Sequence, residues 1–267
     1  MPTDAPVNFR LTLTDGIAEV SLDRPEKKNP LTFESYAELR DWFRGLVYRD
    51  DVKVVIFGSN GGNFCSGGDV FEIIGPLLDK DMKGLLEFTR MTGDLVKAII
   101  GCGKPVIAAV DGVCAGAGAI IAMCSDLRLA TPEAKTAFLF NRVGLAGCDM
   151  GACAILPRII GEARAAELFY TGDVIDAQTA LDWGLVSRVV AGETLMDEAR
   201  ALAARVAAMP PYALRQAKNL MRQGRSISYD TALEMAANTQ ALMHLTDDHM
   251  EGIDALLEKR RPRFEGR

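Results

Sequence analysis

The sequence is poor in the residues that build metal centres and histidine-dependent active sites. It has two histidines, His244 and His249, and both lie near the C-terminal end. The cysteines form no CxxC pair, and none stands at zinc spacing from a histidine. They occupy positions 65, 102, 114, 124, 148 and 153. We therefore expect no metal site, and we interpret the cysteines as reduced, buried small side chains.

The chain also has neither a net positive charge nor a long apolar run. The formal net charge of -6 at pH 7 argues against a general binder of nucleic acid or anionic membranes, because clustered Lys and Arg hold such partners. The longest weakly polar run, Val113 to Cys124, is too short and too rich in glycine to span a bilayer. The stretch "MPTDAPVNFRLTL" lacks the features of a secretory signal. We expect a cytoplasmic protein without nucleic acid or membrane as a partner.

Apolar segments of strand length alternate with helical patterns in the first part of the chain. Alternating apolar residues in 9–22, interrupted by "TDG", predict a β-hairpin. Continuous apolar runs at 52–59, 104–110 and 126–131 predict buried strands, and helices are predicted at 32–47, 83–100 and 117–123. Alternation of this kind is typical of an α/β fold with a mainly parallel sheet.

The pattern changes to consecutive helices beyond about Ala191. Helices are predicted at 195–208, 212–222, 229–245 and 248–259, with "MPPY" as a breaker between the first two. The sequence therefore predicts an α/β core over residues 1–191 and a helical C-terminal region over residues 192–267.

Two segments share one design, in which a strand is followed by a turn of small residues and then by a helix. The first turn is Cys65-Ser66-Gly67-Gly68-Asp69, and the second lies in "DGVCAGAGAII". Glycine allows close approach to a ligand, and a helix N-terminus offers unpaired N–H donors. Neither segment has Walker or GxGxxG spacing, so a nucleotide site is not indicated. Alternatively, the glycines only permit tight packing of helix on sheet, although two such loops on neighbouring strands weaken this reading.

Several ordered motifs resemble the enoyl-CoA hydratase/isomerase (crotonase) superfamily over essentially the whole chain. They are "NFCSGGDV", "KPVIAAVDGVCAGAGAIIAMCSDLRLA", "LPRIIG", "AAELFYTGDVIDAQTALDWGLV" and "EGIDALLEKRRPRFEGR". The resemblance implies the α/β crotonase fold, a Clp-protease-like spiral of ββα units with a helical C-terminal region. It also implies an acyl-CoA thioester as substrate, coenzyme A being part of the substrate and no separate cofactor being needed. The amides of Gly68 and Ala117 would form an oxyanion hole for the thioester enolate.

The carboxylates that the resemblance implies for hydration are missing. Family members that hydrate an enoyl-CoA carry one Glu three residues after the second oxyanion donor, where this chain has Ile120. The position of their second Glu is held by Phe140 or Asn141. Ile120 and Asn141 would then line the acyl site, and Ile120 would make it more apolar and compatible with a ring or a branched acyl group.

Asp149 is the remaining carboxylate near these motifs. It lies twelve residues before Gly161, a spacing that resembles the catalytic Asp of some dienoyl-CoA isomerases and chlorobenzoyl-CoA dehalogenases of the superfamily. In an apolar pocket its pKa would be raised, which suits a general acid or base. The alternative is that Asp149 caps the helix that begins near Gly151.

Contacts with coenzyme A are also implied by the resemblance. Lys27 and Lys28 would lie along the nucleotide, with backbone contacts from Ser66 and Asp69. The basic tail supplies Lys259, and it supplies Phe264 to cover the adenine, often at a neighbouring subunit's site in this family; a solvated charge run is the alternative. Family members assemble as trimers or as pairs of trimers, so we expect a homotrimer or a dimer of trimers.

Three other polar residues are candidates for the site or its surroundings. Glu72 would face the acyl pocket or be an exposed helical carboxylate, and Arg142 would pair with Asp149 or lie on the surface. Asp126 resembles a structural Asp of the family.

Three functions follow from these observations. The first is a lyase or isomerase that uses Asp149 as its single acid or base, with ordinary two-Glu hydration doubtful. The alternative is a catalytically impaired member of the family that binds CoA esters. A serine peptidase of the Clp type is poorly supported, because no Ser–His pair can be placed.

Overall fold

A computed structural model describes residues 5–267; the first four residues of the predicted core, 1–4, lie outside this range. Its centre is a six-stranded sheet in the order β1-β2-β3-β4-β6-β9. Strands β1 and β2 form the predicted antiparallel hairpin, and the other neighbours are parallel. The strands are β1 (Arg10–Thr14), β2 (Ile17–Leu22), β3 (Val54–Ser59), β4 (Val106–Val110), β6 (Leu127–Ala130) and β9 (Arg188–Val189).

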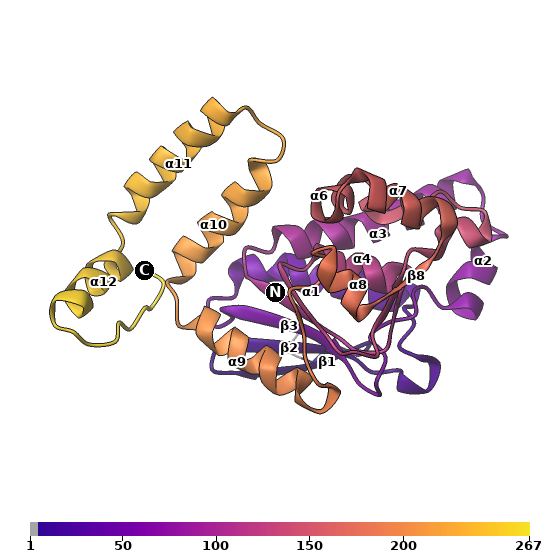
Figure 1. The fold of residues 1–267 in the computed structure, drawn as a ribbon, viewed down its shortest axis with the longest axis horizontal. Coiled ribbons are helices and arrows are strands. Elements are labelled where there is room, and N and C mark those ends of the chain that lie inside the picture. Colours follow the sequence, from indigo (N-terminus) through magenta and orange to yellow (C-terminus); the bar gives the residue numbers. More distant parts are fainter. Residues whose placement is uncertain (1–4) are drawn as a thin grey trace.

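Helices cover both faces of this sheet, which explains the continuous apolar runs. On β3, Val55 and Phe57 face a large core beneath α1 (Phe33–Gly45), α3 (Met82–Gly101) and α4 (Ala117–Cys124). Val54 and Ile56 face a smaller core against α9 (Leu195–Ala207). Figure 1 shows α9 on one side of the strands and α1 and α3 on the other. The predicted helices and buried strands of the core are therefore confirmed, and their ends differ from the predicted ones by at most two residues.

A second, three-stranded sheet was not predicted. Its order is β5-β7-β8, and β5 (Val113–Ala115), β7 (Lys135–Ala137) and β8 (Val174–Asp176) have three residues each. Strand β5 follows β4 after Asp111 and Gly112, so the chain passes from one sheet to the other immediately before α4. The second predicted loop therefore contains a strand.

Short helices connect the larger elements. The 3-10 helices are η1 (Pro25–Lys27), η2 (Leu46–Tyr48), η4 (Leu139–Val143), η5 (Asp149–Gly151) and η6 (Gly192–Thr194), and η3 (Val70–Ile74) is a π-helix. The short α-helices are α2 (Gly75–Leu77), α5 (Ala152–Ile155), α6 (Pro157–Ile160), α7 (Glu162–Thr171) and α8 (Ala177–Asp182).

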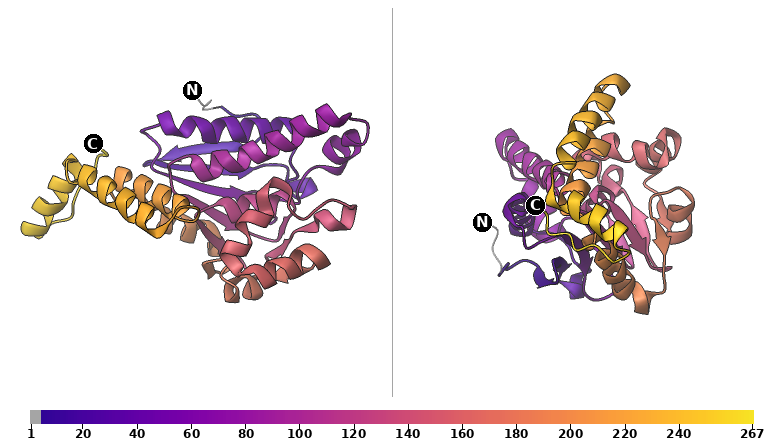
Figure 2. Two further views of the ribbon diagram at one scale, coloured as in Figure 1. Left: turned by 90° about the horizontal axis from the view of Figure 1, so that it is seen from above. Right: turned by 90° about the vertical axis from the view of Figure 1, so that its left-hand side faces the viewer.

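The last three helices form an arm that projects from the core (Figure 2). They are α10 (Pro211–Gln223), α11 (Tyr229–Met243) and α12 (Asp247–Leu257). The predicted change to consecutive helices near residue 191 is present, but α9 packs on the sheet, and the chain leaves the core one helix later. Lys218 of α10 ties the arm to the core through Asp126 Oδ2, 2.7 Å away, and the Lys104 carbonyl, 2.8 Å away.

The structure corrects one statement about the cysteines. All six are free, and Cys65, Cys102, Cys114 and Cys124 are buried as expected. Cys148 and Cys153 are exposed, because Cys148 directly precedes η5 and Cys153 lies on α5, both at the surface rather than in the core. Among residues 5–267, no helix combines the length and the apolar character needed to cross a membrane.

Candidate active site

The first loop follows β3 and is held against the start of α1. The Leu31 amide donates to the Gly67 carbonyl at 2.8 Å, and the Asp69 amide donates to the Leu31 carbonyl at 2.8 Å. Leu31 thus bonds to the residues on both sides of Gly68. Thr32 then begins α1 with a capping box, in which its side chain accepts from the Ser35 amide. The conformation of Gly68 is therefore fixed by hydrogen bonds made through its neighbours.

The second loop is joined edge to edge with the first. The Cys65 amide donates to the Val113 carbonyl, and the Ala115 amide donates to the Cys65 carbonyl, both at 2.9 Å. Gly118 of α4 lies so close to Cys65 that an added Cβ would stand 2.5 Å from the Cys65 carbonyl oxygen. Gly116 has φ +52 and ψ -122, a conformation open only to glycine, and it turns the chain from β5 into α4.

The amides of Gly68 and Ala117 have no hydrogen-bond acceptor within the described part of the chain. Ala117 is the first residue of α4, where an amide has no partner inside the helix. The loops approach closely at this point, since a Cβ added to Gly67 would stand 3.7 Å from the Ala117 nitrogen. Two unpaired backbone donors therefore lie on adjoining loops.

Asp149 lies half-buried on η5 and is not a helix cap. Its Oδ1 accepts the amide of the next residue, Met150, at 2.8 Å. Helix α5 begins after Gly151 without any side-chain cap, so the capping alternative raised by the sequence is wrong. Burial raises the pKa of Asp149, and the bond from the Met150 amide only partly offsets this effect. Asp149 is thus a half-buried carboxyl with a raised pKa.

The two residues predicted for the acyl site have different environments. Ile120 is fully buried on α4 and belongs to the large core. Asn141 is half-buried, and its side-chain Nδ2 donates to the Tyr170 carbonyl near the end of α7 at 2.9 Å, while its Oδ1 has no hydrogen-bond partner. The side chain of Asn141 therefore turns toward α7 in this structure.

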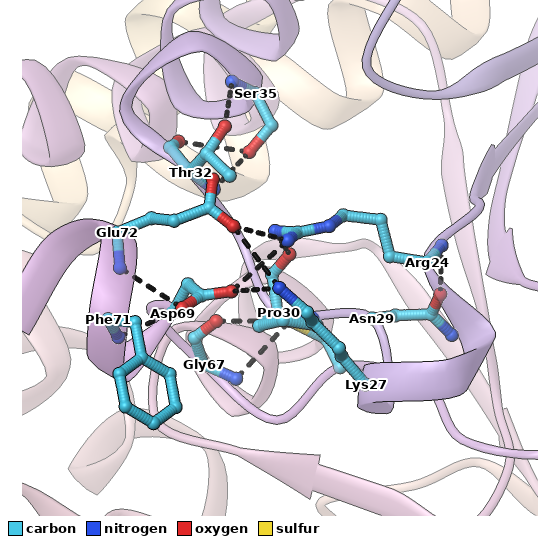
Figure 3. A network of polar contacts seen from close by, with 11 residues as sticks. Arg24, Lys27, Asn29, Pro30, Thr32, Ser35, Gly67, Asp69, Phe71 and Glu72 are labelled. Carbon is cyan, nitrogen blue, oxygen red and sulfur yellow. Dashed lines mark hydrogen bonds and ion pairs between the residues drawn. The ribbon is translucent and has the colours of Figure 1, made fainter.

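Figure 3 shows a polar network beside the first loop. Asp69 caps η3 by accepting from the Phe71 and Glu72 amides at 3.0 and 3.1 Å. Arg24 lies 3.2 Å from its Oδ2 and donates to Glu72 at 2.6 Å. Burial alone would raise the pKa of Asp69, but the two amides and the cations Lys27 and Arg24 hold it below its usual value. The network fixes η3 onto the loop that carries Lys27.

The residues predicted to contact the nucleotide are partly engaged within the protein. Lys27 lies 3.4 Å from Glu72 and 3.8 Å from Asp69, whereas the exposed Lys28 uses its carbonyl to accept the Ser66 amide. The Asp69 amide and carbonyl are both engaged, the carbonyl with Ile73 and Ile74. The Ser66 carbonyl has no donor among residues 5–267, so it is the backbone group still open to the predicted contact.

The structure does not bring the tail of the chain to its own loops. Lys53, which precedes β3, donates to the Phe264 carbonyl at 3.3 Å. The first loop follows the other end of β3, and six residues at roughly 3.3 Å each separate the two ends by about 20 Å. Figure 1 shows α12 and the C-terminus at one end of the molecule and α2, which follows the first loop, at the other. Lys259 and Phe264 therefore lie far from Lys27 of the same chain.

The remaining candidates take structural or surface positions. Asp126 accepts the Val106 amide at 2.8 Å and pairs with Lys218, as expected of a structural residue. Arg142 is exposed and forms no ion pair with Asp149. His244 and His249 are hydrogen-bonded to each other in the arm at 3.0 Å.

Sequence reasoning missed the asparagines that hold the loops together. Asn29 is 1% exposed, and its Nδ2 donates to the carbonyls of Asn60 and Asn63 at 2.8 and 2.7 Å. Asn63 Oδ1 in turn accepts the Val113 amide at 3.1 Å. These bonds link the segments that follow β2, β3 and β4. The sequence signal that could have identified them is an asparagine in each of two loops whose other residues are typical of turns.

Comparison with known proteins shows which family the chain matches. Residues 12–267 match the family model described as enoyl-CoA hydratase/isomerase. The chain is 34% identical to 1,2-epoxyphenylacetyl-CoA isomerase of Escherichia coli (strain K12), over 94% of this chain and 96% of that protein. It is 33% identical to crotonyl-CoA hydratase of Syntrophomonas wolfei, over 96% and 97%.

Solved structures show the same architecture. A structure assigned to an enoyl-CoA hydratase from Streptomyces coelicolor A3(2) superposes with a TM-score of 0.97 at 44% identity, over 100% of this chain and 97% of that one. An enoyl-CoA hydratase from Bacillus anthracis gives 0.92 at 29% identity, over 98% and 100%. With its α/β crotonase fold and its matching relatives, the chain belongs to the enoyl-CoA hydratase/isomerase family.

Proposed function

We propose that the protein binds an acyl-CoA thioester with its carbonyl oxygen between the amides of Gly68 and Ala117. The observation that carries this proposal is the pair of unpaired donors on adjoining loops. Removal of a proton next to a thioester places negative charge on that oxygen, and fixed donors stabilise the charge without reorganising. Loss of one such donor typically costs about 3 kcal/mol of transition-state stabilisation.

Asp149 is the proposed single acid and base. As a carboxylate it takes a proton from a carbon next to the thioester and leaves an enolate whose charge lies largely on the carbonyl oxygen. The protonated carboxyl then returns the proton to another carbon of the conjugated system. One proton is taken and one is given back, so the net change is migration of a double bond, and one carboxylate suffices.

Isomerisation fits the side chains better than hydration by two glutamates. Hydration of that kind activates a water with one carboxylate and delivers a proton with another, and this chain has Ile120 and either Phe140 or Asn141 at the implied positions. The relative from E. coli is named an isomerase of an epoxyphenylacetyl-CoA and that from S. wolfei a hydratase, so the similar proteins include both isomerases and hydratases. The alternative of a catalytically impaired binder is not favoured, because these relatives are named as enzymes.

We also propose that the protein assembles as a homotrimer or a dimer of trimers. The arm exposes large apolar side chains on α11, α12 and the segment between them, a surface that association would bury. They are Leu242, Leu245, Met250, Leu256 and Leu257, each more than half exposed. The distance between the tail and the first loop supports the same proposal, since Lys259 and Phe264 would then serve a neighbouring subunit's site.

A panel of enoyl-CoA and dienoyl-CoA esters with short, branched and aryl acyl groups tests this function. Double-bond migration and hydration are followed separately by chromatography of the products. The expected result is migration of a double bond in at least one ester, at a rate above any hydration. Tight binding of the esters without turnover would instead support the catalytically impaired alternative.

A further inference from the structure

Tyr36 lies one helical turn from the first loop. It follows Leu31 and Thr32 at the start of α1, and its amide donates to the Thr32 carbonyl at 3.0 Å. Leu31 is the residue that bonds to both sides of Gly68. One turn of α-helix rises about 5.4 Å, so the Tyr36 side chain starts close to the unpaired Gly68 amide. The side chain is 3% exposed and points into the protein.

The ring of Tyr36 packs against an aromatic side chain of a neighbouring helix. Phe88 of α3 packs edge-on against it, with ring centres 6.0 Å apart. Helix α3 contacts both α1 and η5, so it brings Tyr36 and Asp149 to the same part of the core. Burial above all, and then the charges of Cys65 and Asp149, raise the pKa of Tyr36 well above its usual value. The phenol therefore stays protonated and is a hydrogen-bond donor.

The hydroxyl of Tyr36 has no partner in the protein, yet it is not sealed in the core. The fully buried side-chain nitrogen and oxygen atoms without a partner, among residues 5–267, belong to Trp42, Asp69 and Asn141. The Tyr36 oxygen is not one of them, so it keeps some accessible surface and can be reached by a ligand. A buried hydroxyl in such a position stabilises a ligand that offers it an acceptor.

We propose that Tyr36 is a specificity-determining residue, whose hydroxyl donates a hydrogen bond to an oxygen substituent on the acyl group held beside Asp149. This inference rests on the proposed function, since it needs the acyl chain to lie between these two side chains. Phe88 packs against the rings of both Phe33 and Tyr36, so the Tyr36 hydroxyl is the polar group of an otherwise apolar aromatic cluster. A pocket built in this way favours an oxygen-bearing acyl group over its hydrocarbon analogue.

The test compares esters that differ by one hydroxyl. Binding of butyryl-CoA and of 2-, 3- and 4-hydroxybutyryl-CoA is measured by calorimetry, with the integrity of each ester checked by chromatography. At least one hydroxy ester is expected to bind the unaltered protein about tenfold more tightly than butyryl-CoA. Tyr36→Phe is expected to abolish that preference and to leave butyryl-CoA affinity unchanged. Tyr48→Phe, at a tyrosine 78% exposed, is expected to preserve it.

Each contrary result has its own meaning. Absence of any hydroxyl preference, or a preference that survives Tyr36→Phe, overturns the inference and leaves the acyl-CoA site standing. Equal weakening of all four esters by Tyr36→Phe shows a structural role and overturns it as well. Failure of every ester to bind the unaltered protein overturns the proposed function itself.

Discussion

At the scale of single residues, Asp149 is where the chemistry and the stability of the protein oppose each other. The carboxyl is half-buried, and the one hydrogen bond that it accepts comes from the next residue. Burial raises its pKa, which favours proton exchange with a weakly acidic carbon. The same burial makes the charged form costly to hold in the folded state.

Asp149→Asn is expected to lower the rate of double-bond migration by about 100- to 10,000-fold, the range typical of general acid–base catalysis. For the unaltered enzyme, kcat/KM should fall with decreasing pH through a pKa above the usual Asp value of about 3.9, because the carboxylate is the base. Product formation measured across pH checks both statements. Full activity in the variant would remove Asp149 from the mechanism.

The same substitution is expected to raise the melting temperature at pH 7. A carboxyl with a raised folded-state pKa contributes stability below its unfolded pKa and loses it as pH rises through the folded value. Asparagine carries no charge at any of these pH values, so its advantage should shrink as pH falls toward about 4. Calorimetry of both proteins between pH 4 and pH 8 measures this difference. A variant that is less stable at pH 7 would argue against a costly buried carboxylate.

At the scale of elements, the site depends on two loops that touch through backbone. The first loop is held by Leu31 and the second by its parallel pairing with Cys65. Gly118 allows α4 to lie against Cys65. The positions of the two donors are thus set mainly by backbone contacts, supported by the side chains of Asn29 and Asn63.

Gly118→Ala is expected to destabilise the protein by about 1–3 kcal/mol, because the new Cβ would stand 2.5 Å from the Cys65 carbonyl oxygen and force the loops apart. The rate on the ester should fall by more than the loss of folded protein accounts for. Gly93→Ala on α3 is the matched control: its Cβ meets nothing within 4 Å, and it should stabilise the helix by about 1 kcal/mol. Denaturant unfolding and rates on one ester compare the two. Equal stability and equal rates for the two variants would contradict the role given to Gly118.

The sequence predicted long periodic elements well and short ones poorly. Strand β3 and helices α1 and α3 carry their own signals, in continuous apolar runs and in the Thr32 cap. Strands β5, β7 and β8 have three residues each and form by pairing with segments distant in the sequence. No local sequence pattern therefore predicts them. The π-helix η3 depends on Arg24 and Lys27 meeting Asp69 and Glu72, which lie more than forty residues further along the chain.

The residues of the candidate site also differ in whether a local sequence signal identifies them. Gly68, Ala117 and Asp149 were found through motifs and spacing, and the structure gives each an environment that suits its predicted role. Tyr36 gave no signal, because an aromatic residue on the apolar face of a helix reads as core. Only the tertiary structure shows that α1, which carries Tyr36, and η5, which carries Asp149, both pack against α3.

At the scale of the whole molecule, the arm and the tail are arranged for a partner. Leu242→Glu places a charge on the exposed apolar face of α11, where Leu242 is 62% exposed, and it is expected to lower the oligomeric state. Light scattering should give three or six times the mass of one chain for the unaltered protein and less for the variant. Val7→Glu, at a residue 89% exposed and away from the arm, should have no effect. A monomeric unaltered protein would refute the proposed assembly.

The central claim is that the amides of Gly68 and Ala117 meet at one thioester oxygen, and a crystal structure of the protein with bound butyryl-CoA tests it most directly. The account predicts the thioester oxygen at about 3 Å from both amide nitrogens, with the acyl chain directed between Asp149 and Tyr36. A thioester oxygen bound to neither nitrogen would contradict the account.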